Sequence, residues 1–311
     1  MDATAAQALQ QQIETIAQGV DGIVGAYIKD LASGIEVAYN ADTPFPMASV
    51  VKVPILHELY RQTEAGSVDL GKRILFAAQH LVPGSGILQD LDFGIAPTLK
   101  DLATLMITVS DNAATDLVIE QIGLAQVETA MQTLGLTSTT IPMTIRGILY
   151  NSVGLDVANP EHTYDLYQQR SKEGYIDWHC RAYGDADNNV STPRDLGLLL
   201  EDIERHTTLS EASCDAMLDI MLRQKYNTIL PLHLPEGARV AHKTGSLRGI
   251  RNDAGIVYAP SGAYLIALCS KRLADTVAGA AALAQVSKAA WESIVGPIPP
   301  GRYGPADEER P

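Results

Sequence analysis

The sequence predicts an α+β fold in which both ends of the chain contribute strands to one sheet and the middle is a helical insertion. Near the N-terminus, apolar residues alternate over 24–28 and again over 35–39, with a Gly-containing turn between them, which predicts a hairpin. From about residue 50 to 230 the pattern is mostly helical. Near the other end, short alternating segments bounded by turn residues predict three more strands, over 239–243, 251–258 and 263–269.

The helices are predicted from apolar spacing and from residues that begin or end a helix. An alanine- and glutamine-rich segment, 5–16, precedes the hairpin, and residues 114–122 have one apolar face closed by Gly123. Thr192 followed by Pro193 predicts a helix start, because proline is favoured at the first helical position. Apolar residues at helical spacing predict a last helix over 273–294.

The order of these elements predicts the domain organisation. With 311 residues, the chain can form one large or two small domains. We expect a discontinuous sheet domain from 1–60 and 235–296, and a helical domain over 61–234 that includes a long loop at 145–190. The segment 297–311, rich in proline and glycine, is expected to be a C-terminal tail.

The charge of the chain excludes two classes of partner. The net charge is −14, from 23 basic and 37 acidic residues, and such a surface repels phosphate backbones and anionic lipid. No apolar run reaches the roughly eighteen residues of a membrane-spanning helix. The first twelve residues lack the basic and apolar regions of an export signal. We expect a soluble monomer that binds neither nucleic acid nor membranes, cytoplasmic as written, or periplasmic or secreted if a precursor was trimmed.

The cysteines and histidines give no sign of a metal or a disulfide framework. Cys180, Cys214 and Cys269 are widely spaced, odd in number and without a CxxC pattern, so at most one disulfide is left open. The seven histidines form no HxxxH or HExxH pair. No metal and no organic cofactor is therefore expected.

A serine and a lysine form the first chemical motif. In Ser49-Val50-Val51-Lys52, a helix starting at Ser49 would place the amine on the same face as the hydroxyl. A serine hydroxyl becomes a good nucleophile when a nearby base takes its proton, and a lysine serves as that base when burial or positive neighbours lower its pKa. Taken alone, the pattern is also consistent with a capping serine and a solvated lysine.

Two further motifs gain meaning from their order. Ser110-Asp111-Asn112 precedes a predicted helix and, taken alone, reads as a helix cap. Lys243-Thr244-Gly245, followed by Ser246, ends a predicted strand and, taken alone, reads as a strand end and turn. Functionally, a lysine and a threonine offer hydrogen-bond donors to a carboxylate, and the glycine lets a substrate lie close to the strand.

In the order SxxK, SDN, KTG, the three motifs resemble the signature of the class A β-lactamases and penicillin-binding proteins. The resemblance runs from the first hairpin to the last helix. It implies an antiparallel sheet with flanking helices plus an inserted helical subdomain, and a serine hydrolase that acts on a small-molecule substrate, a β-lactam or an acyl-D-amino-acid carboxylate.

The resemblance also implies a role for each motif residue. Ser49 would form the acyl-enzyme, Lys52 would accept or relay its proton, and Ser110 would donate to the departing nitrogen. Asn112 would hold the substrate and Lys52. Lys243 and Thr244 would bind the substrate carboxylate, with Arg251 as a second positive charge. The backbone amides of Ser49 and Ser246 would form the oxyanion hole, and Gly245 belongs to the substrate-binding strand.

One departure from the family pattern leaves the outcome open. Class A β-lactamases carry a Glu-x-x-Leu-Asn pattern before the threonine-proline, whose glutamate activates the deacylating water, and this chain lacks it. Glu173 is the least unfavourable substitute among the loop carboxylates, which are Glu161, Glu173, Asp177, Asp185 and Asp187. The alternatives are a β-lactamase, a D-Ala-D-Ala carboxypeptidase or esterase, and a non-catalytic carboxylate-binding module. In the second alternative, β-lactams would acylate the enzyme and the acyl group would be removed only slowly. The aromatic side chains of the same loop, such as Tyr167 and Trp178, would either roof the cleft or pack locally.

Overall fold

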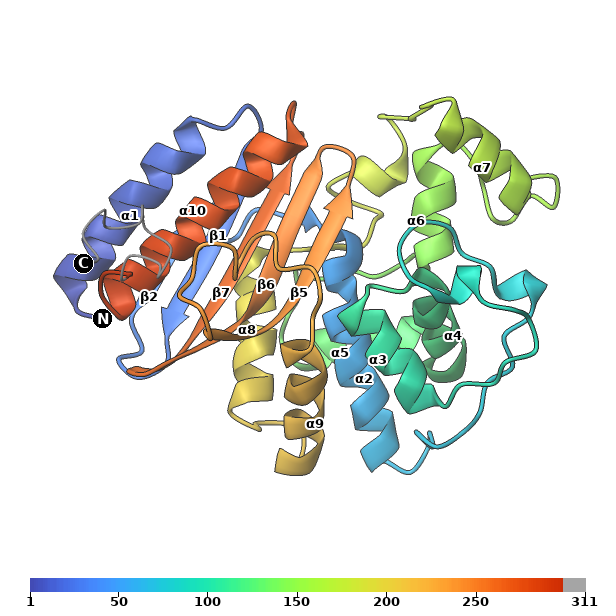
Figure 1. Ribbon diagram of the computed structural model, residues 1–311, viewed down its shortest axis with the longest axis horizontal. Helices are drawn as coiled ribbons and strands as arrows, with labels where there is room; N and C mark the ends of the chain where they lie inside the picture. The colour runs from blue at the N-terminus through green and yellow to red at the C-terminus, as the bar shows by residue number, and fades with distance from the viewer. Residues whose placement is uncertain (299–311) are drawn as a thin grey trace, which may run out of the picture.

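The computed structural model describes residues 1–298, and its centre is a five-stranded antiparallel sheet (Figure 1). The strand order is β2-β1-β7-β6-β5. The bounds are β1 Ile23–Asp30, β2 Glu36–Tyr39, β5 Arg239–Leu247, β6 Ile250–Ala259 and β7 Gly262–Lys271. A separate pair joins β3, Phe45–Pro46, to β4, Val190–Ser191. The predicted α+β class, N-terminal hairpin and three late strands are confirmed.

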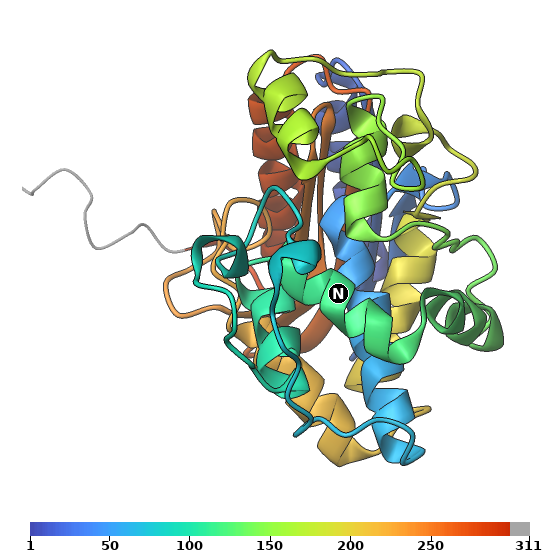
Figure 2. The same ribbon diagram turned by 90° about the vertical axis from the view of Figure 1, so that its right-hand side faces the viewer.

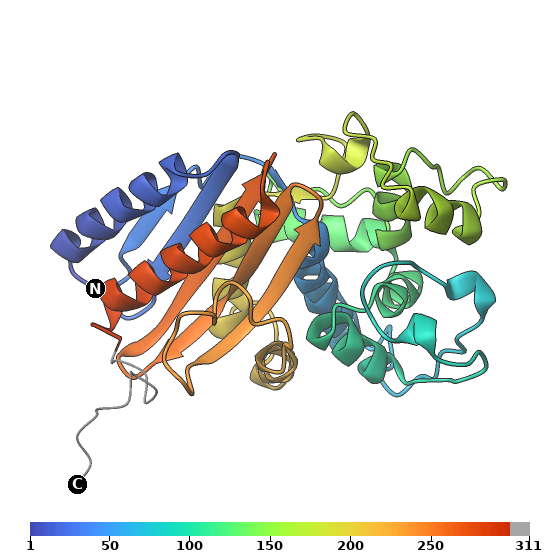
Figure 3. The ribbon, with the colours of Figure 1, turned by 45° about the horizontal axis from the view of Figure 1, so that its top comes forward.

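Two terminal helices cover one face of the sheet (Figures 1 and 3). They are α1, Ala3–Gln18, and α10, Thr276–Ile294, and they lie side by side. Strand β7 shows why both faces are buried: Tyr264 and Ile266 belong to the core under these helices, while Leu265 belongs to the core on the other side. The strand is therefore apolar along its length, unlike a half-exposed strand.

The other face of the sheet is covered by α8, Pro193–Glu204, which contacts β1, β6 and β7. Thr192 caps this helix by accepting a hydrogen bond from the Asp195 amide, and Pro193 is its first residue, as predicted. The next helix, α9, Glu211–Leu222, lies against β5. Both helices come from the stretch assigned to the helical domain, yet they cover the sheet. The domain division itself stays a prediction.

The helical part lies beside the β5 edge of the sheet, around the long central helix α2 (Figures 1 and 2). Its helices are α2 Lys52–Glu64, α3 Leu99–Thr108, α4 Asn112–Ile122, α5 Leu124–Thr133, α6 Ile145–Ser152 and α7 Tyr164–Lys172. The segment 145–190, expected to be a long loop, contains two of them. Thr144 and Thr163 cap α6 and α7, a signal that the interpretation of this segment as a loop overlooked.

Further sequence-based expectations concern thiols, membranes and the chain end. Cys180, Cys214 and Cys269 are free thiols in the structure. Over residues 1–298, no helix combines the length and the apolar character that crossing a bilayer requires. Most of the segment expected to be a C-terminal tail, 299–311, lies outside the described residues.

Candidate active site

Ser49 lies in a short 3₁₀ turn, Ala48–Val51, directly before helix α2. Ala48 has a left-handed backbone with φ 47°, an uncommon conformation that a surrounding structure must hold in place. The side chain of Asn252, on β6, supplies that hold: its Nδ2 donates to the carbonyls of Pro46 at 2.8 Å and Met47 at 3.1 Å. The sheet therefore fixes the backbone that presents Ser49.

Lys52 is the first residue of α2, and its side chain is fully buried. Its Nζ donates to the Ser110 carbonyl at 2.7 Å, the Ser110 Oγ at 3.1 Å and the Asn112 Oδ1 at 2.8 Å. Burial, and next the positive charge of Lys243, hold the pKa of Lys52 well below its ordinary value. A lysine with a lowered pKa can accept a proton, which an ordinary surface lysine cannot do at neutral pH.

Ser110 lies between two lysine amines. Its Oγ is 3.1 Å from Lys52 Nζ and 3.0 Å from Lys243 Nζ. When both amines donate, both lone pairs of the hydroxyl are used, and its own hydrogen is left to donate into the cavity. The backbone at Ser110 is left-handed, with φ 54°, a strain of the kind found at functional positions.

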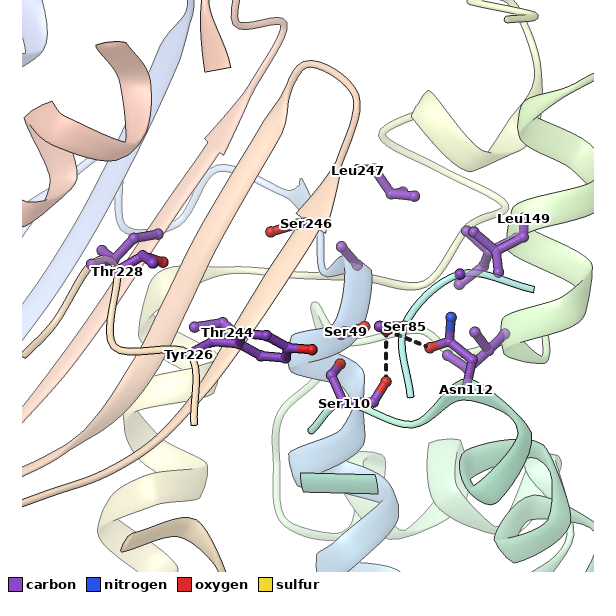
Figure 4. A pocket seen from close by; sticks show the side chains of 15 residues that line it. Ser49, Ser85, Ser110, Asn112, Leu149, Tyr226, Thr228, Thr244, Ser246 and Leu247 are labelled. Carbon is purple, nitrogen blue, oxygen red and sulfur yellow. Dashed lines mark hydrogen bonds between the residues drawn. The ribbon is translucent and has the colours of Figure 1, made fainter. Parts of the chain in front are cut away.

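Asp111 and Asn112 fix the segment around Ser110. Asp111 is the cap of α4, accepting from the Ala114 amide, as the sequence predicts. Asn112 Nδ2 donates to the Pro83 carbonyl at 2.8 Å, and its Oδ1 accepts from Lys52. Ser85 Oγ donates to the Ser110 carbonyl at 2.7 Å and lies 3.3 Å from Asn112 Oδ1 (Figure 4).

The third motif lies on β5. Lys243 is fully buried and donates to Ser110 Oγ and to the Thr244 carbonyl at 2.7 Å. Burial lowers its pKa to about 7, and the Asp253 carboxylate on the neighbouring strand opposes that fall. Asp253 in turn lies 2.9 Å from His242 Nδ1 and accepts from the Leu230 amide. Burial thus destabilises the positive charge of Lys243, and one buried carboxylate stabilises it.

Gly245 explains how β5 approaches the nucleophile. A Cβ at this position would lie 2.6 Å from the Met47 carbonyl and 3.1 Å from the Val50 amide, so only glycine fits. The close contact brings the next residue, Ser246, beside the Ser49 turn, and both line the same cavity (Figure 4). The predicted oxyanion hole needs this proximity of two backbone segments.

One cavity of about 290 Å³ lies between the sheet and the helical part, and residues of all three motifs line it, with Lys52 and Lys243 buried behind Ser110. Its wall on α6 is apolar and includes Leu149 (Figure 4). Among the described residues that line the cavity there is no aspartate, glutamate or histidine. The lining residues are Ala48, Ser49, Gly84, Ser85, Ser110, Asn112, Ile145, Ile148, Leu149, Tyr226, Thr228, Ile229, Thr244, Ser246 and Leu247.

Glu173 and Arg251, which the sequence suggested for the site, do not line this cavity. Glu173 is exposed at the end of α7 and accepts a hydrogen bond from Gln169. Arg251 donates through Nη1 to the carbonyls of Leu247 and Ile250, which flank the turn between β5 and β6. Neither is among the lining residues, so neither the suggested deacylating carboxylate nor the suggested second positive charge for a substrate carboxylate lines the cavity.

Sequence reasoning missed Ser85, which holds the backbone of Ser110, and gave Asn252 no role. A Pro83-Gly84-Ser85-Gly86 run reads as an ordinary turn, and nothing in it points to Ser110, about 25 residues further along. Of the aromatic residues of the loop, Tyr167 packs locally on Tyr150 with ring centroids 5.5 Å apart, whereas Trp178 is exposed, and neither lines the catalytic cavity.

Comparison with known proteins gives consistent matches over most of the chain. A model described as the β-lactamase enzyme family matches residues 8–294. A β-lactamase of Bacillus licheniformis is 27% identical over 256 residues, which cover 81% of this chain and 72% of that protein.

Solved structures agree with these sequence matches. A β-lactamase from Sphaerobacter thermophilus is 30% identical with a TM-score of 0.77, covering 96% of this chain and all of the other. The protein PBP-A is 30% identical with a TM-score of 0.75, covering 92% of this chain and 95% of the other. A mutant of PBP-A, 31% identical with a TM-score of 0.74 over 92% of this chain and 96% of the other, was solved as an acyl-enzyme complex with penicillin G.

Proposed function

Because this chain belongs to the β-lactamase enzyme family, we propose that it is a serine hydrolase that opens β-lactam rings through an acyl-enzyme at Ser49. The matches confirm the family and the enzyme class predicted from the three motifs. The observation that supports the role of the site residues best is Ser110 Oγ, held within about 3 Å of two buried lysine amines on the floor of the cavity.

The proposed acylation assigns one step each to Ser49, Lys52 and Ser110. Lys52, whose pKa is lowered, takes the proton of Ser49 as its Oγ attacks the carbonyl carbon of the ring amide. The bond between that carbon and the ring nitrogen breaks, and the nitrogen takes the proton of Ser110 Oγ. Lys52 returns its proton to Ser110 across their 3.1 Å contact. The backbone amides of Ser49 and Ser246 are proposed to stabilise the oxyanion, a contact typically worth about 2.7–4 kcal/mol in barrier height.

Substrate binding is proposed to use the β5 side of the cavity. Thr244 lines the cavity, and Lys243 lies buried behind it with its amine on Ser110. A carboxylate on the substrate would accept from the Thr244 hydroxyl and gain from the charge of Lys243. Asn112 is proposed to orient the substrate amide. Arg251 is proposed to brace the turn that carries Leu247 rather than to touch the carboxylate, because its Nη1 already donates to two turn carbonyls.

A second candidate function is supported by the apolar wall on α6. Without a carboxylate beside the acyl group, the deacylating water lacks a general base, whose help is typically worth about 10²–10⁴-fold. The second candidate is therefore an acyl-D-amino-acid carboxypeptidase or esterase. β-Lactams acylate such an enzyme, and the acyl group is then hydrolysed off slowly. Both candidates share the acylation machinery and differ only in the fate of the acyl-enzyme.

Stopped-flow measurements with a chromogenic cephalosporin, combined with intact-protein mass, test both candidates. Sustained colour with a transient adduct supports a β-lactamase. A stoichiometric burst with a lasting increase in mass supports the second candidate.

The control is Ser49→Ala, which should abolish adduct and colour alike, with a loss of at least about 10⁴-fold. Survival of the adduct in this variant would show that another residue is the nucleophile. Absence of both colour and adduct with the unmodified protein would contradict both candidates.

A further inference from the structure

A second cavity, of about 510 Å³, lies on the other side of the turn that joins β5 to β6. In Figure 1 the segment between α7 and α8 lies next to the end of these two strands. Leu247 lines the catalytic cavity, whereas the next two residues, Arg248 and Gly249, line the second one. No residue lines both cavities. The lining residues are Trp178, His179, Cys180, Tyr183, Gly184, Arg248, Gly249, Ile250, Lys271, Arg272 and Leu273.

This cavity is positively charged, although the chain as a whole has a net charge of −14. Three of its lining residues are cations, and one carboxylate serves two of them. Asp185 accepts from Lys271 at 2.7 Å and from Arg272 at 3.4 Å. Arg248 is exposed and has no carboxylate within 4.0 Å among residues 1–298. A second carboxylate, Asp177, accepts from the His179 amide at 3.0 Å and lies within 4.0 Å of none of these three cations. Counting both carboxylates, the group still has one positive charge in excess, and Arg248 is the cation without a carboxylate partner among the described residues.

The cavity also offers a fixed aromatic surface. Trp178 is 53% exposed, and its ring lies 5.1 Å from that of Tyr183 at an angle of 42°. A Cβ on Gly249 would lie 3.4 Å from the Trp178 ring, an ordinary contact distance, so the indole lies directly against this turn, and the φ of 73° at Gly249 favours glycine there. The Gly249 carbonyl is in turn held by the Leu273 amide at 2.9 Å. An exposed indole held in place beside an unpaired guanidinium is a surface that can bind a ligand.

We propose that this cavity is a second ligand site, for a small anion attached to a planar ring. An arginine guanidinium binds a carboxylate, sulfonate or phosphate oxygen pair through two parallel hydrogen bonds, which Arg248 is free to make and Arg272 can join. The ring of such a ligand stacks on Trp178. Because Leu247 at the end of β5 lines the catalytic cavity and the next residues, Arg248 and Gly249, line this one, a ligand here adjoins the catalytic cavity without entering it.

The test uses naphthalene-2-carboxylate as the probe and the indole N–H signals of the two tryptophans as the readout. Trp178 is exposed and Trp291 is buried in α10, so the two signals should separate, and Trp178→Phe assigns them. Titration of the full chain should shift the Trp178 signal with saturation below about 5 mM and leave the Trp291 signal in place. The uncharged naphthalene-2-carboxamide should bind at least about tenfold more weakly.

Matched variants distinguish charge-dependent binding of the probe from nonspecific binding to the protein surface. The double variant Arg248→Gln with Arg272→Gln should weaken binding of the carboxylate at least about tenfold. The control, Arg73→Gln, removes an exposed arginine near Thr98 and should leave binding unchanged. Equal affinity for the carboxylate and the carboxamide, full affinity in the double variant, or no shift at about 5 mM would each overturn the proposal.

Discussion

Two walls of the catalytic cavity differ sharply in their chemistry. Around Ser110, the polar side chains of Lys52, Asn112, Ser85 and Lys243 bond to one another, to Ser110 or to its backbone. The wall on α6 offers Leu149 and two isoleucines (Figure 4). The first wall contains the groups that attack on an amide requires, and the second contains none that activates water. Acylation and deacylation should therefore respond to different substitutions.

Within this comparison, the largest expected effect on rate comes from replacing Lys52 in the polar wall. Lys52→Met keeps a buried side chain of similar length and removes the proton acceptor, so the acylation rate should fall by about 10³-fold. The Ser110 carbonyl and Asn112 Oδ1 keep Ser85 as a partner, so the variant should still fold. Pre-steady-state mass spectrometry measures the rate. Lys72→Met, at an exposed lysine bonded to Gln121, is the control, and a fall of less than about tenfold in the Lys52 variant would contradict the role of Lys52.

The apolar wall can be changed in the opposite direction. Leu149→Glu places a carboxylate in the cavity, on a half-buried position where it can stay ionised, and deacylation should accelerate by about 10²-fold. Acylation should change by less than about threefold, because no polar contact of the other wall is touched. Decay of the acyl-enzyme mass measures the step. Leu149→Gln has the same size without a base, and equal deacylation rates in both variants would refute the comparison.

The pH dependence should sharpen the contrast between the two steps. The pKa of Lys243 is about 7, so its charge is lost as the pH rises through that value. For a carboxylate-bearing β-lactam, kcat/KM for acylation should then fall by up to about tenfold per pH unit, whereas a methyl ester of the same compound should show no such fall. Asp253→Asn removes the carboxylate that raises the pKa of Lys243, and it should move the fall to lower pH. Identical profiles for acid and ester would contradict the role of Lys243.

Unfolding does not account for such a fall. The pKa of Lys243 is lower in the folded than in the unfolded chain, so the unfolded chain binds more protons between pH 7 and the ordinary lysine pKa of 10.5. The contribution of this group to the free energy of unfolding therefore rises with pH across that window. Urea unfolding at several pH values checks the sign.

The smallest expected effect on acylation comes from Asn252, whose side chain fixes the backbone that presents Ser49. Asn252→Ala removes the donor to the Pro46 and Met47 carbonyls and the acceptor of the Ser270 amide, leaving buried groups without partners. The free energy of unfolding should fall by about 1–3 kcal/mol. Acylation should slow by less than about tenfold, since the reacting groups remain. Gln7→Ala, at an exposed amide on α1, should change neither quantity.

Part of the polar wall could be predicted from residue types at fixed spacings, whereas the roles of Ser110, Asn112 and Lys243 came from the family resemblance that the three motifs carry together. Ser49 and Lys52 lie one helical turn apart in any helical segment, and Asp111 is a strong capping residue wherever α4 begins. The strands were predictable for a similar reason, since alternation along β1 or β6 reflects the two faces of any sheet.

The remaining features depend on distances in space between segments that share no local pattern. Ser85 and Asn252 act on backbone carbonyls of remote segments, and no spacing rule connects them to their partners. The periodicity of α8 predicts a helix with one apolar face but does not say that this face covers the sheet. Glu173 shows the converse: its place in the sequence suggested a role, and the position of α7 removes it from the cavity.

The central position of β1 and β7 has a consequence for how the protein is made. Strand β1 needs β7 on its inner side, and the two are separated by more than 200 positions, from Asp30 to Gly262. During synthesis on the ribosome, the edge of β1 therefore stays unpaired until β7 has emerged. Lys243 and Asn252 lie shortly before β7 in the chain. A nascent chain therefore lacks the catalytic cavity over the same interval, and this is the stage at which a chaperone would help most.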